Sequence, residues 1–215
     1  MIVSNDDKTV FQSSILNSDS IIHGFSTRAF GDGRDIDVLK KYLSKKNITY
    51  KHIVQPHQTH STNIQIVSKA DLTKETVLIL DCDGLVTVEE NVVLTVVTAD
   101  CVPIIYYDSI AKVAGISHQG WKGTTDNLPR VVIEKMIASG ANASQIQCVM
   151  GPAINSCCYH LNLYKMNRET VQKSGVSKEN IDIFPFCTCC DEERFYSYRR
   201  EGKINGEMIH FVMMR

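Results

Sequence analysis

Residues 98–123 carry the pattern of a β-hairpin with two metal-ligand side chains at its open end. The stretch reads TADCVPIIYYDSIAKVAGISHQGWKG. Residues 102–107 and 113–116 are apolar or β-branched, and a turn over residues 108–111 separates them, as in two antiparallel strands. Pairing Asp108 with Ala111 across this turn places Cys101 opposite His118. Directly opposed residues share a face of the sheet, with Cβ atoms about 5 Å apart.

The Cys101–His118 pair suits two kinds of chemistry. A thiolate and an imidazole are both zinc ligands, and a cysteine nucleophile beside its base needs the same two groups. The prediction depends on register, because a one-residue slip would send the two side chains to opposite faces. For a metal, a third ligand would come from one of the other histidines: His57, His60, His23, His52, His160 or His210. Two histidines and one cysteine leave a fourth zinc position open, which is the catalytic pattern.

Composition predicts one globular domain over residues 1–215. Hydrophobic residues make up 43% of the chain and charged residues 22%, which is enough for a sizeable core. The net charge of −1 argues against nucleic acid or an anionic membrane as a partner. No apolar run is long enough to span a bilayer, and the first ten residues are acidic, unlike a signal peptide. We therefore expect a cytoplasmic protein.

The chain has eight cysteines, which we expect to be reduced. Cys82 and Cys148 lie in apolar runs and are expected to be buried. The group at residues 187–190 is spaced C-x-C-C, which differs from the C-x2–4-C of zinc knuckles. Without an obvious second half, we expect no metal there, and Cys157-Cys158 is expected to serve packing.

Hydrophobic periodicity predicts more strands than helices, interspersed along the chain. Strands are expected at 21–27, 48–54, 64–67, 77–80, 85–87, 92–97, 146–150 and 209–213. Helices are expected at 35–46 and 161–173, and a third follows the GWKG loop (120–123), with Thr125 or Asp126 as its N-cap and Pro129 in its first turn. The pattern predicts an α+β domain with mixed, largely antiparallel sheets.

Polar residues at predicted strand ends are candidates for the remaining chemistry. Asp81, Asp83 and Asp100 could each be a general acid or base, or could hold the tautomer of a histidine, although Asp is also common in turns. Arg28 follows a strand and could clamp an anion through two hydrogen bonds. The GWKG loop leads to a helix N-terminus, a position that favours phosphate.

Seven ordered motifs resemble one protein family. They are HGFSTR (23–28), QTHS (58–61), DGLVT (83–87), TADCVPI (98–104), HQGWKG (118–123), GPAI with CCY (151–159) and FYSYRREG (195–202). Together they are similar to the family first called multicopper polyphenol oxidoreductase or laccase. That family is now described as purine nucleoside phosphorylase with adenosine deaminase activity, and it includes peptidoglycan editing factors and laccase-domain proteins. The chain departs from the usual motifs at Ser61, Gln119, Lys122 and residues 29–33.

The resemblance implies a zinc site formed by His60, Cys101 and His118, with copper as the other metal to consider. The implied fold is a single three-layer α/β domain like that of the cytotoxic-necrotising-factor catalytic domain. The implied reaction is phosphorolysis of purine nucleosides of the adenosine, inosine and methylthioadenosine class, together with adenosine deamination. Purine nucleosides and phosphate are then the partners, and monomer and homodimer both stay open.

On this hypothesis Cys101, His118 and Asp100 are the catalytic residues, and Arg28, Asp83 and Lys122 bind substrate. Two alternatives use the same pair of side chains. One is a copper polyphenol oxidase, although seven histidines are few for several coppers. The other is a cysteine hydrolase or amidase, acting on peptidoglycan precursors, with Cys101 as nucleophile and His118 as base.

Overall fold

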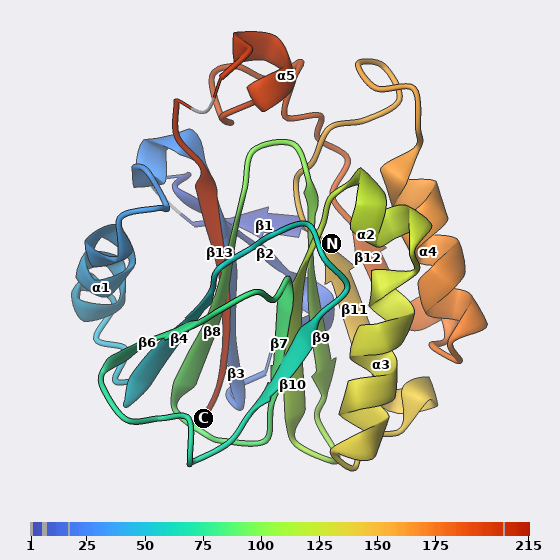
Figure 1. The fold of residues 1–215 in the computed structure, drawn as a ribbon. Helices are drawn as coiled ribbons and strands as arrows, with labels where there is room; N and C mark the ends of the chain where they lie inside the picture. Colours follow the sequence, from blue (N-terminus) through green and yellow to red (C-terminus); the bar gives the residue numbers. More distant parts are fainter. Residues whose placement is uncertain (1, 6–7, 17, 204) are drawn as a thin grey trace.

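Two mixed β-sheets lie face to face, with helices on their outer faces (Figure 1). The structure is a computed structural model that describes residues 2–5, 8–16, 18–203 and 205–215. The seven-stranded sheet has the order β1 (Ile2–Ser4), β2 (Val10–Ser13), β3 (Ile21–Ser26), β13 (Met208–Met214), β8 (Val92–Thr98), β4 (His52–Pro56) and β6 (Thr76–Ile79). The six-stranded sheet has the order β12 (Ile181–Ile183), β11 (Gln147–Met150), β9 (Val102–Asp108), β10 (Val113–Gln119), β7 (Gly84–Thr87) and β5 (Ile64–Val67). Most neighbours are antiparallel; β4–β6, β4–β8, β5–β7 and β11–β12 are parallel.

Apolar cores fill the spaces between these layers. One core joins the facing surfaces of the two sheets and includes Phe25, Leu94 and Ile116. A second lies between the six-stranded sheet and helices α3 (Leu128–Ala138) and α4 (Leu163–Lys173). The two sheets and this helical layer form three layers, and helix α1 (Ile36–Lys45) packs singly on the outer face of the seven-stranded sheet. The predicted α+β class with mixed, largely antiparallel sheets is confirmed.

The predicted hairpin forms, but its register was predicted wrongly by two residues. In β9–β10, Val113 pairs with Asp108 and His118 pairs with Pro103. The Asp108 carboxylate accepts the N–H groups of Ile110 and Ala111, which lengthens the turn. The longer turn includes Lys112, which adopts a positive φ of 51°. A shift of two residues preserves the sheet face, so Cys101, just before β9, still lies on the side of His118.

Helices α1 and α4 fall where the periodicity predicts them. Asp35 caps α1 by accepting the N–H of Asp37, and Asn162 caps α4 by accepting that of Lys165. The GWKG segment was predicted wrongly as a loop: it opens the short helix α2 (Trp121–Thr125). Because α2 occupies the expected N-cap positions, α3 begins later, after Asn127.

Three short strands escaped the sequence analysis: β1, β2 and β12. Each has at most four residues, a length at which the apolar–polar pattern finds some strands and misses others, since the four-residue strands β5, β6, β7 and β11 were predicted. Strand β4 also begins later than predicted and extends to Pro56. None of the helices in the described ranges is long and apolar enough to cross a membrane.

Candidate metal and substrate site

Three segments that are distant in the sequence bring His60, Cys101 and His118 together; we call these residues the His–Cys–His site. His60 lies in the loop after β4, Cys101 just before β9, and His118 on β10. Their ligand atoms all lie within 4.8 Å of one another. The Cys101 sulfur is 3.9 Å from His60 Nε2, and the two imidazole rings meet edge to face with their centroids 4.8 Å apart.

A buried carboxylate, that of Asp83, fixes the orientation of His118. His118 Nδ1 lies 2.8 Å from Asp83 Oδ1. Asp83 is fully buried and His118 is 4% exposed. With Nδ1 directed to the carboxylate, Nε2 is the nitrogen left for a ligand, the arrangement that carboxylate–histidine–metal sites use.

The same carboxylate shapes the loop that carries His60. Asp83 accepts the backbone N–H groups of Thr59, His60 and Ser61, and also the Ser61 hydroxyl at 2.7 Å. These bonds hold His60 in the left-handed region, at a φ of 57°. The Asp83 carboxylate is enclosed and positions two of the three site residues. This supports the alternative expectation that it holds a histidine, and gives less support to the predicted contact with substrate.

Gly120 provides the space in which these side chains meet. A Cβ atom at this position would lie 2.7 Å from His60 Cδ2 and 3.3 Å from the Cys101 sulfur. Both distances are shorter than ordinary van der Waals contacts, so a larger residue would displace the site residues. The first glycine of the HQGWKG motif thus has a steric role at the site.

The electrostatics of the site favour a thiolate beside a charged imidazole. Burial alone would raise the pKa of Cys101, but the positive His118 and hydrogen bonds from His118 and His60 lower it to about 7. Burial alone would lower the pKa of His118, but the Cys101 thiolate and Asp83 raise it to about 10. Burial opposes the ionisation of Asp83, yet hydrogen bonds from His118 and Ser61 bring its pKa down to about 2.

The donor set fits a zinc or copper ion. Two imidazole nitrogens and a thiolate sulfur converge, one imidazole has a carboxylate behind it, and three protein ligands leave room for a further one. His60 and Cys101 are reached from solvent whereas His118 is buried. The fold thus brings the three predicted ligands together. That these residues bind a metal stays a prediction.

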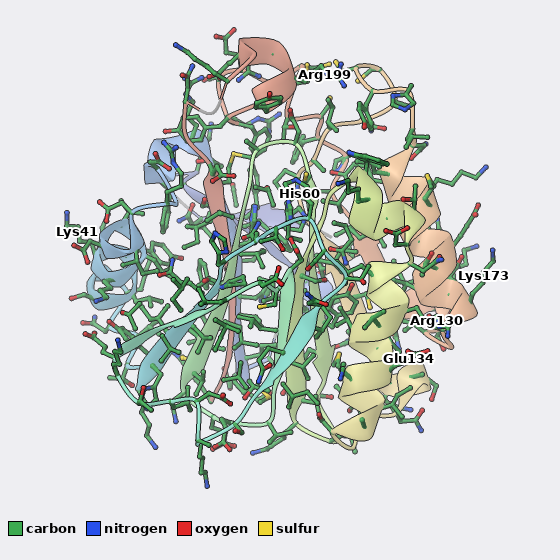
Figure 2. The ribbon with its side chains drawn as sticks, viewed as in Figure 1. Lys41, His60, Arg130, Glu134, Lys173 and Arg199 are labelled. Carbon is green, nitrogen blue, oxygen red and sulfur yellow. The ribbon has the colours of Figure 1, made fainter. Side chains whose placement is uncertain are left out.

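The site opens into a cavity of about 810 Å³, which we call the site cavity. It is lined by backbone or side-chain atoms of Arg34, Gln55, Pro56, His57, Gln58, His60, Leu78, Val97, Ala99, Asp100, Cys101, His118, Trp121, Ile154, Tyr159, Leu163, Tyr198, Arg199 and Glu207. Figure 2 shows His60 near the ends of the central strands, on the same side of the molecule as Arg199 of helix α5 (Tyr198–Glu201). A cavity of this size suits a nucleoside-sized ligand.

The sequence analysis missed several charged and aromatic residues of this cavity. The Arg199 guanidinium stacks on Tyr159, 5.1 Å from the ring centroid, and Arg34 pairs with Asp32. Burial raises the pKa of Glu207 above that of an exposed glutamate. Tyr159 and Arg199 lie inside the CCY and FYSYRREG motifs, which gave them no role. Arg34 and Glu207 lie outside the motifs, and Glu207 lines the cavity from just before β13.

Asp100 lines the cavity, but its carboxylate is already bonded to protein groups. It is 8% exposed. Its Oδ1 accepts the Thr188 hydroxyl at 2.6 Å and its Oδ2 accepts the backbone N–H of Arg199 at 2.7 Å. This geometry supports a role in positioning the segment that carries Arg199, and gives less support to the predicted catalytic role.

Arg28 and Lys122 are not among the residues that line the site cavity, so the geometry gives no support to their predicted role in substrate binding, which stays a prediction. Arg28 stacks on Tyr196, 5.0 Å from the ring centroid, and lies 4.0 Å from Glu201. Lys122 is exposed on α2, with its ammonium 5.8 Å from the Trp121 ring centroid. Both positions follow from contacts that sequence spacing does not encode, namely the packing of residues 194–201 and the turn of α2.

Comparison with known proteins identifies the family. The sequence profile of the family described as multi-copper polyphenol oxidoreductase laccase matches residues 37–162 and 159–215. The chain belongs to this family, as its motifs indicated.

Relatives of the chain have enzyme names. It is 28% identical to purine nucleoside phosphorylase YlmD of Bacillus subtilis (strain 168), over 93% of this chain and 90% of that protein. It is 30% identical to adenosine deaminase RL5, from an unknown prokaryotic organism, over 80% of this chain and 79% of that protein. The solved structure of the hypothetical protein YfiH of Bacillus licheniformis superposes with a TM-score of 0.82 at 27% identity, covering 91% of this chain and 93% of that one.

Proposed function

We propose that this chain is a cytoplasmic, zinc-dependent purine nucleoside phosphorylase, acting on nucleosides of the adenosine, inosine and methylthioadenosine class, that also deaminates adenosine. The observation that carries the proposal is the His–Cys–His site at the wall of a nucleoside-sized cavity, with Asp83 behind His118. Relatives named purine nucleoside phosphorylase and adenosine deaminase, similar over most of the chain, support the same reaction class.

The walls of the cavity provide apolar and aromatic surface for a purine. Tyr159, Tyr198 and Trp121 all line it, with Ile154 and Leu163 beside them. A purine buried between such side chains is held by stacking and by loss of apolar surface to water. Trp121 is half exposed, so a bound base would cover part of its ring.

A cationic side chain near the base would hold phosphate. Arg199 lines the cavity, its guanidinium stacks on Tyr159, and its backbone N–H is bonded to Asp100. In phosphorolysis a phosphate oxygen forms a bond to C1′ of the ribose while the C1′–N9 bond breaks, and the purine takes both electrons. The departing purine needs a proton, which Glu207 is positioned to supply from its carboxyl group.

Deamination uses the same cavity with water in place of phosphate. Water adds to C6 of adenosine, the C6–N bond breaks, and one proton of the water passes to the departing ammonia. Glu207 can carry that proton, a task that glutamate performs in the zinc deaminases. When bound by His60, Cys101 and His118, zinc would supply Lewis-acid chemistry and would make water ionise near neutral pH.

A second candidate function is a cysteine hydrolase or amidase. The specific observation in its favour is the thiolate–imidazolium character of Cys101 and His118, together with the carboxylate that orients the imidazole. These are the three parts of a cysteine nucleophile with its base and orienting group. Such an enzyme would need no metal.

One experiment separates the two functions. The protein is purified without added metal, its zinc and copper are quantified, and it is incubated with adenosine with and without phosphate. We expect phosphate-dependent release of adenine, some inosine, and loss of both after zinc is removed by a chelator. Turnover unaffected by the chelator, on any substrate, would favour the cysteine hydrolase and contradict the proposal.

Two variants test the proposed roles of Cys101 and Glu207. Cys101→Ala should abolish turnover and remove metal from the site, whereas Glu207→Gln should lower turnover about 100-fold or more while metal stays bound, because proton transfer typically contributes that much. Glu179→Gln is a matched control, since Glu179 is an exposed glutamate of the 3₁₀ turn before β12. Full activity in the Cys101→Ala variant would refute the ligand role.

A further inference from the structure

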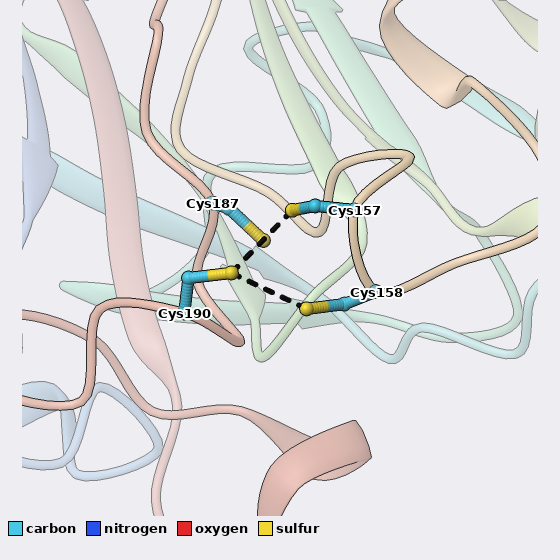
Figure 3. A group of neighbouring side chains, drawn as sticks. All are labelled: Cys157, Cys158, Cys187 and Cys190. Atoms are coloured by element: carbon cyan, nitrogen blue, oxygen red, sulfur yellow. Dashed lines mark hydrogen bonds between the residues drawn. The ribbon is translucent and has the colours of Figure 1, made fainter.

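Four cysteines gather outside the site cavity, and we call them the four-cysteine cluster: Cys157, Cys158, Cys187 and Cys190 (Figure 3). Their sulfur atoms all lie within 4.8 Å of one another. The Cys190 sulfur is 3.4 Å from that of Cys157 and 3.3 Å from that of Cys158. Each of the four is a free thiol.

The structure supplies the second group of cysteines that the spacing of residues 187–190 lacked. Cys187 and Cys190 on their own have the C-x2-C spacing of a zinc knuckle; the intervening Cys189 hides this spacing and lies outside the group. The missing second half is Cys157-Cys158, in the loop after β11. A parallel bridge between Ala153 and Cys187 brings the two loops side by side.

We propose that the four-cysteine cluster binds a structural zinc ion. A tetrahedron of sulfurs about 2.3 Å from zinc has edges of about 3.8 Å, and the observed sulfur contacts are close to this length. Four thiolates complete the coordination shell, so no position stays open for substrate, and the role is to hold the fold.

The backbone around Cys187 supports a thiolate there. The N–H of Asn155 lies 3.3 Å from the Cys187 sulfur, and the N–H of Cys190 also donates to it. Hydrogen bonds of this kind orient and stabilise a ligating thiolate. One of the two donors comes from the opposite loop, so the two loops are already arranged around this sulfur.

Other uses of four cysteines fit the geometry less well. A disulfide joins two sulfurs about 2 Å apart and would leave the other two of the cluster without a role. An iron–sulfur cluster inserts its own iron and sulfide atoms between the protein thiolates, so its ligands stand further apart than those of a single ion. The tight packing of four sulfurs around one point favours one tetrahedral ion.

A zinc ion here would clamp one wall of the site cavity. The loop of Cys157 and Cys158 contains Ile154 and Tyr159, which line that cavity, and Arg199 stacks on Tyr159. The loop of Cys187 and Cys190 supplies Thr188, whose hydroxyl bonds Asp100. Tying the loops together would restrict the motion of the wall that carries these residues, since closing a long loop removes conformational freedom.

The test uses the full chain with the His–Cys–His site disabled by Cys101→Ala. We expect this variant, purified without added metal, to retain about one zinc per chain, and X-ray absorption at the zinc edge to show about four sulfur neighbours near 2.3 Å. A zinc environment with nitrogen ligands, bound iron, or no metal would overturn the proposal. Thiol counting by mass spectrometry under native and denaturing conditions identifies a disulfide, which would overturn it as well.

Variants of the cluster provide a second measurement that does not depend on activity. Adding Cys187→Ser and Cys190→Ser to the Cys101→Ala background should remove the remaining zinc and lower the melting temperature by several degrees, because the ion stabilises only the folded state. The matched control is Cys189→Ser, which changes a neighbouring thiol that contacts Cys158 but is not one of the four, and which should leave zinc content unchanged. Unchanged zinc content in the double serine variant would contradict the assignment.

Discussion

At the candidate site, one buried carboxylate contacts both of the segments that supply histidines. Asp83 bonds His118 Nδ1 and the backbone of residues 59–61, so it fixes the imidazole and the His60 loop together. An aspartate in a D-G turn is ordinary, and spacing alone left Asp83 as one of three candidates. Its burial and its bond to His118 distinguish it from Asp81, which is exposed and accepts the Thr59 hydroxyl, and from Asp100, which bonds Thr188 and Arg199.

Replacing Asp83 by Asn should weaken the site. An amide presents an NH₂ group to N–H donors, so Asp83→Asn leaves several buried donors without acceptors and costs about 3 kcal/mol of stability. We expect metal affinity to fall about 10- to 100-fold, as for other partners of ligating histidines. A zinc-competition titration measures this, and Asp81→Asn, in the same turn but exposed, is the control. Equal affinity in both variants would contradict the role of Asp83.

At the scale of elements, the β9–β10 hairpin connects the site at one end with a stabilising turn at the other. Asp108 is 1% exposed, and its two carboxylate oxygens accept the N–H groups of Ile110, Ala111 and Asn142. It thereby joins the turn to the chain that follows α3. These contacts also explain the longer turn and the register shift of two residues, which pattern analysis of the strands did not foresee.

Removing the Asp108 carboxylate should lower stability without changing the site. Asp108→Ala removes the carboxylate that accepts the backbone N–H groups of Ile110, Ala111 and Asn142, at a cost of about 2 kcal/mol in the free energy of unfolding. Chemical denaturation measures the loss, and metal content and turnover of the folded variant should equal those of the parent protein. A fall in metal content with unchanged stability would show that the turn influences the ligands, against this expectation.

At the scale of the whole molecule, the seven-stranded sheet contains two buried histidines that are kept neutral. Burial lowers the pKa of His23 to about 4, and its Nε2 accepts the N–H of Ser13, which requires that nitrogen to be unprotonated. Burial, together with the positive charge of His118, also lowers the pKa of His210 on β13 to about 3. Because both values lie below the ordinary 6.5, the unfolded chain binds protons that the folded chain excludes.

Stability should therefore fall as pH falls through the window from about 6.5 to about 4. His23 alone, with its pKa lowered from 6.5 to about 4, contributes about 3 kcal/mol that is present above pH 6.5 and lost across this window. Urea denaturation between pH 7 and pH 5 measures the slope. We expect His23→Gln to reduce the slope of stability against pH. The control His160→Gln, which changes an exposed histidine, should leave the slope unchanged. An identical slope in the His23 variant would contradict this account.

The sequence by itself determined the fold class, the longer strands and helices, the family, and the residues His60, Cys101 and His118. Periodicity and ordered motifs are local properties, and the sheet face of the hairpin tolerates a register error of two residues. The tertiary structure alone decided which residues surround that site. Glu207, Arg199 and the four-cysteine cluster come from segments far apart in the chain, while Arg28 and Lys122 lie against the rings of Tyr196 and Trp121. Side-chain packing between distant segments sets these positions, and spacing along one segment carries no record of it.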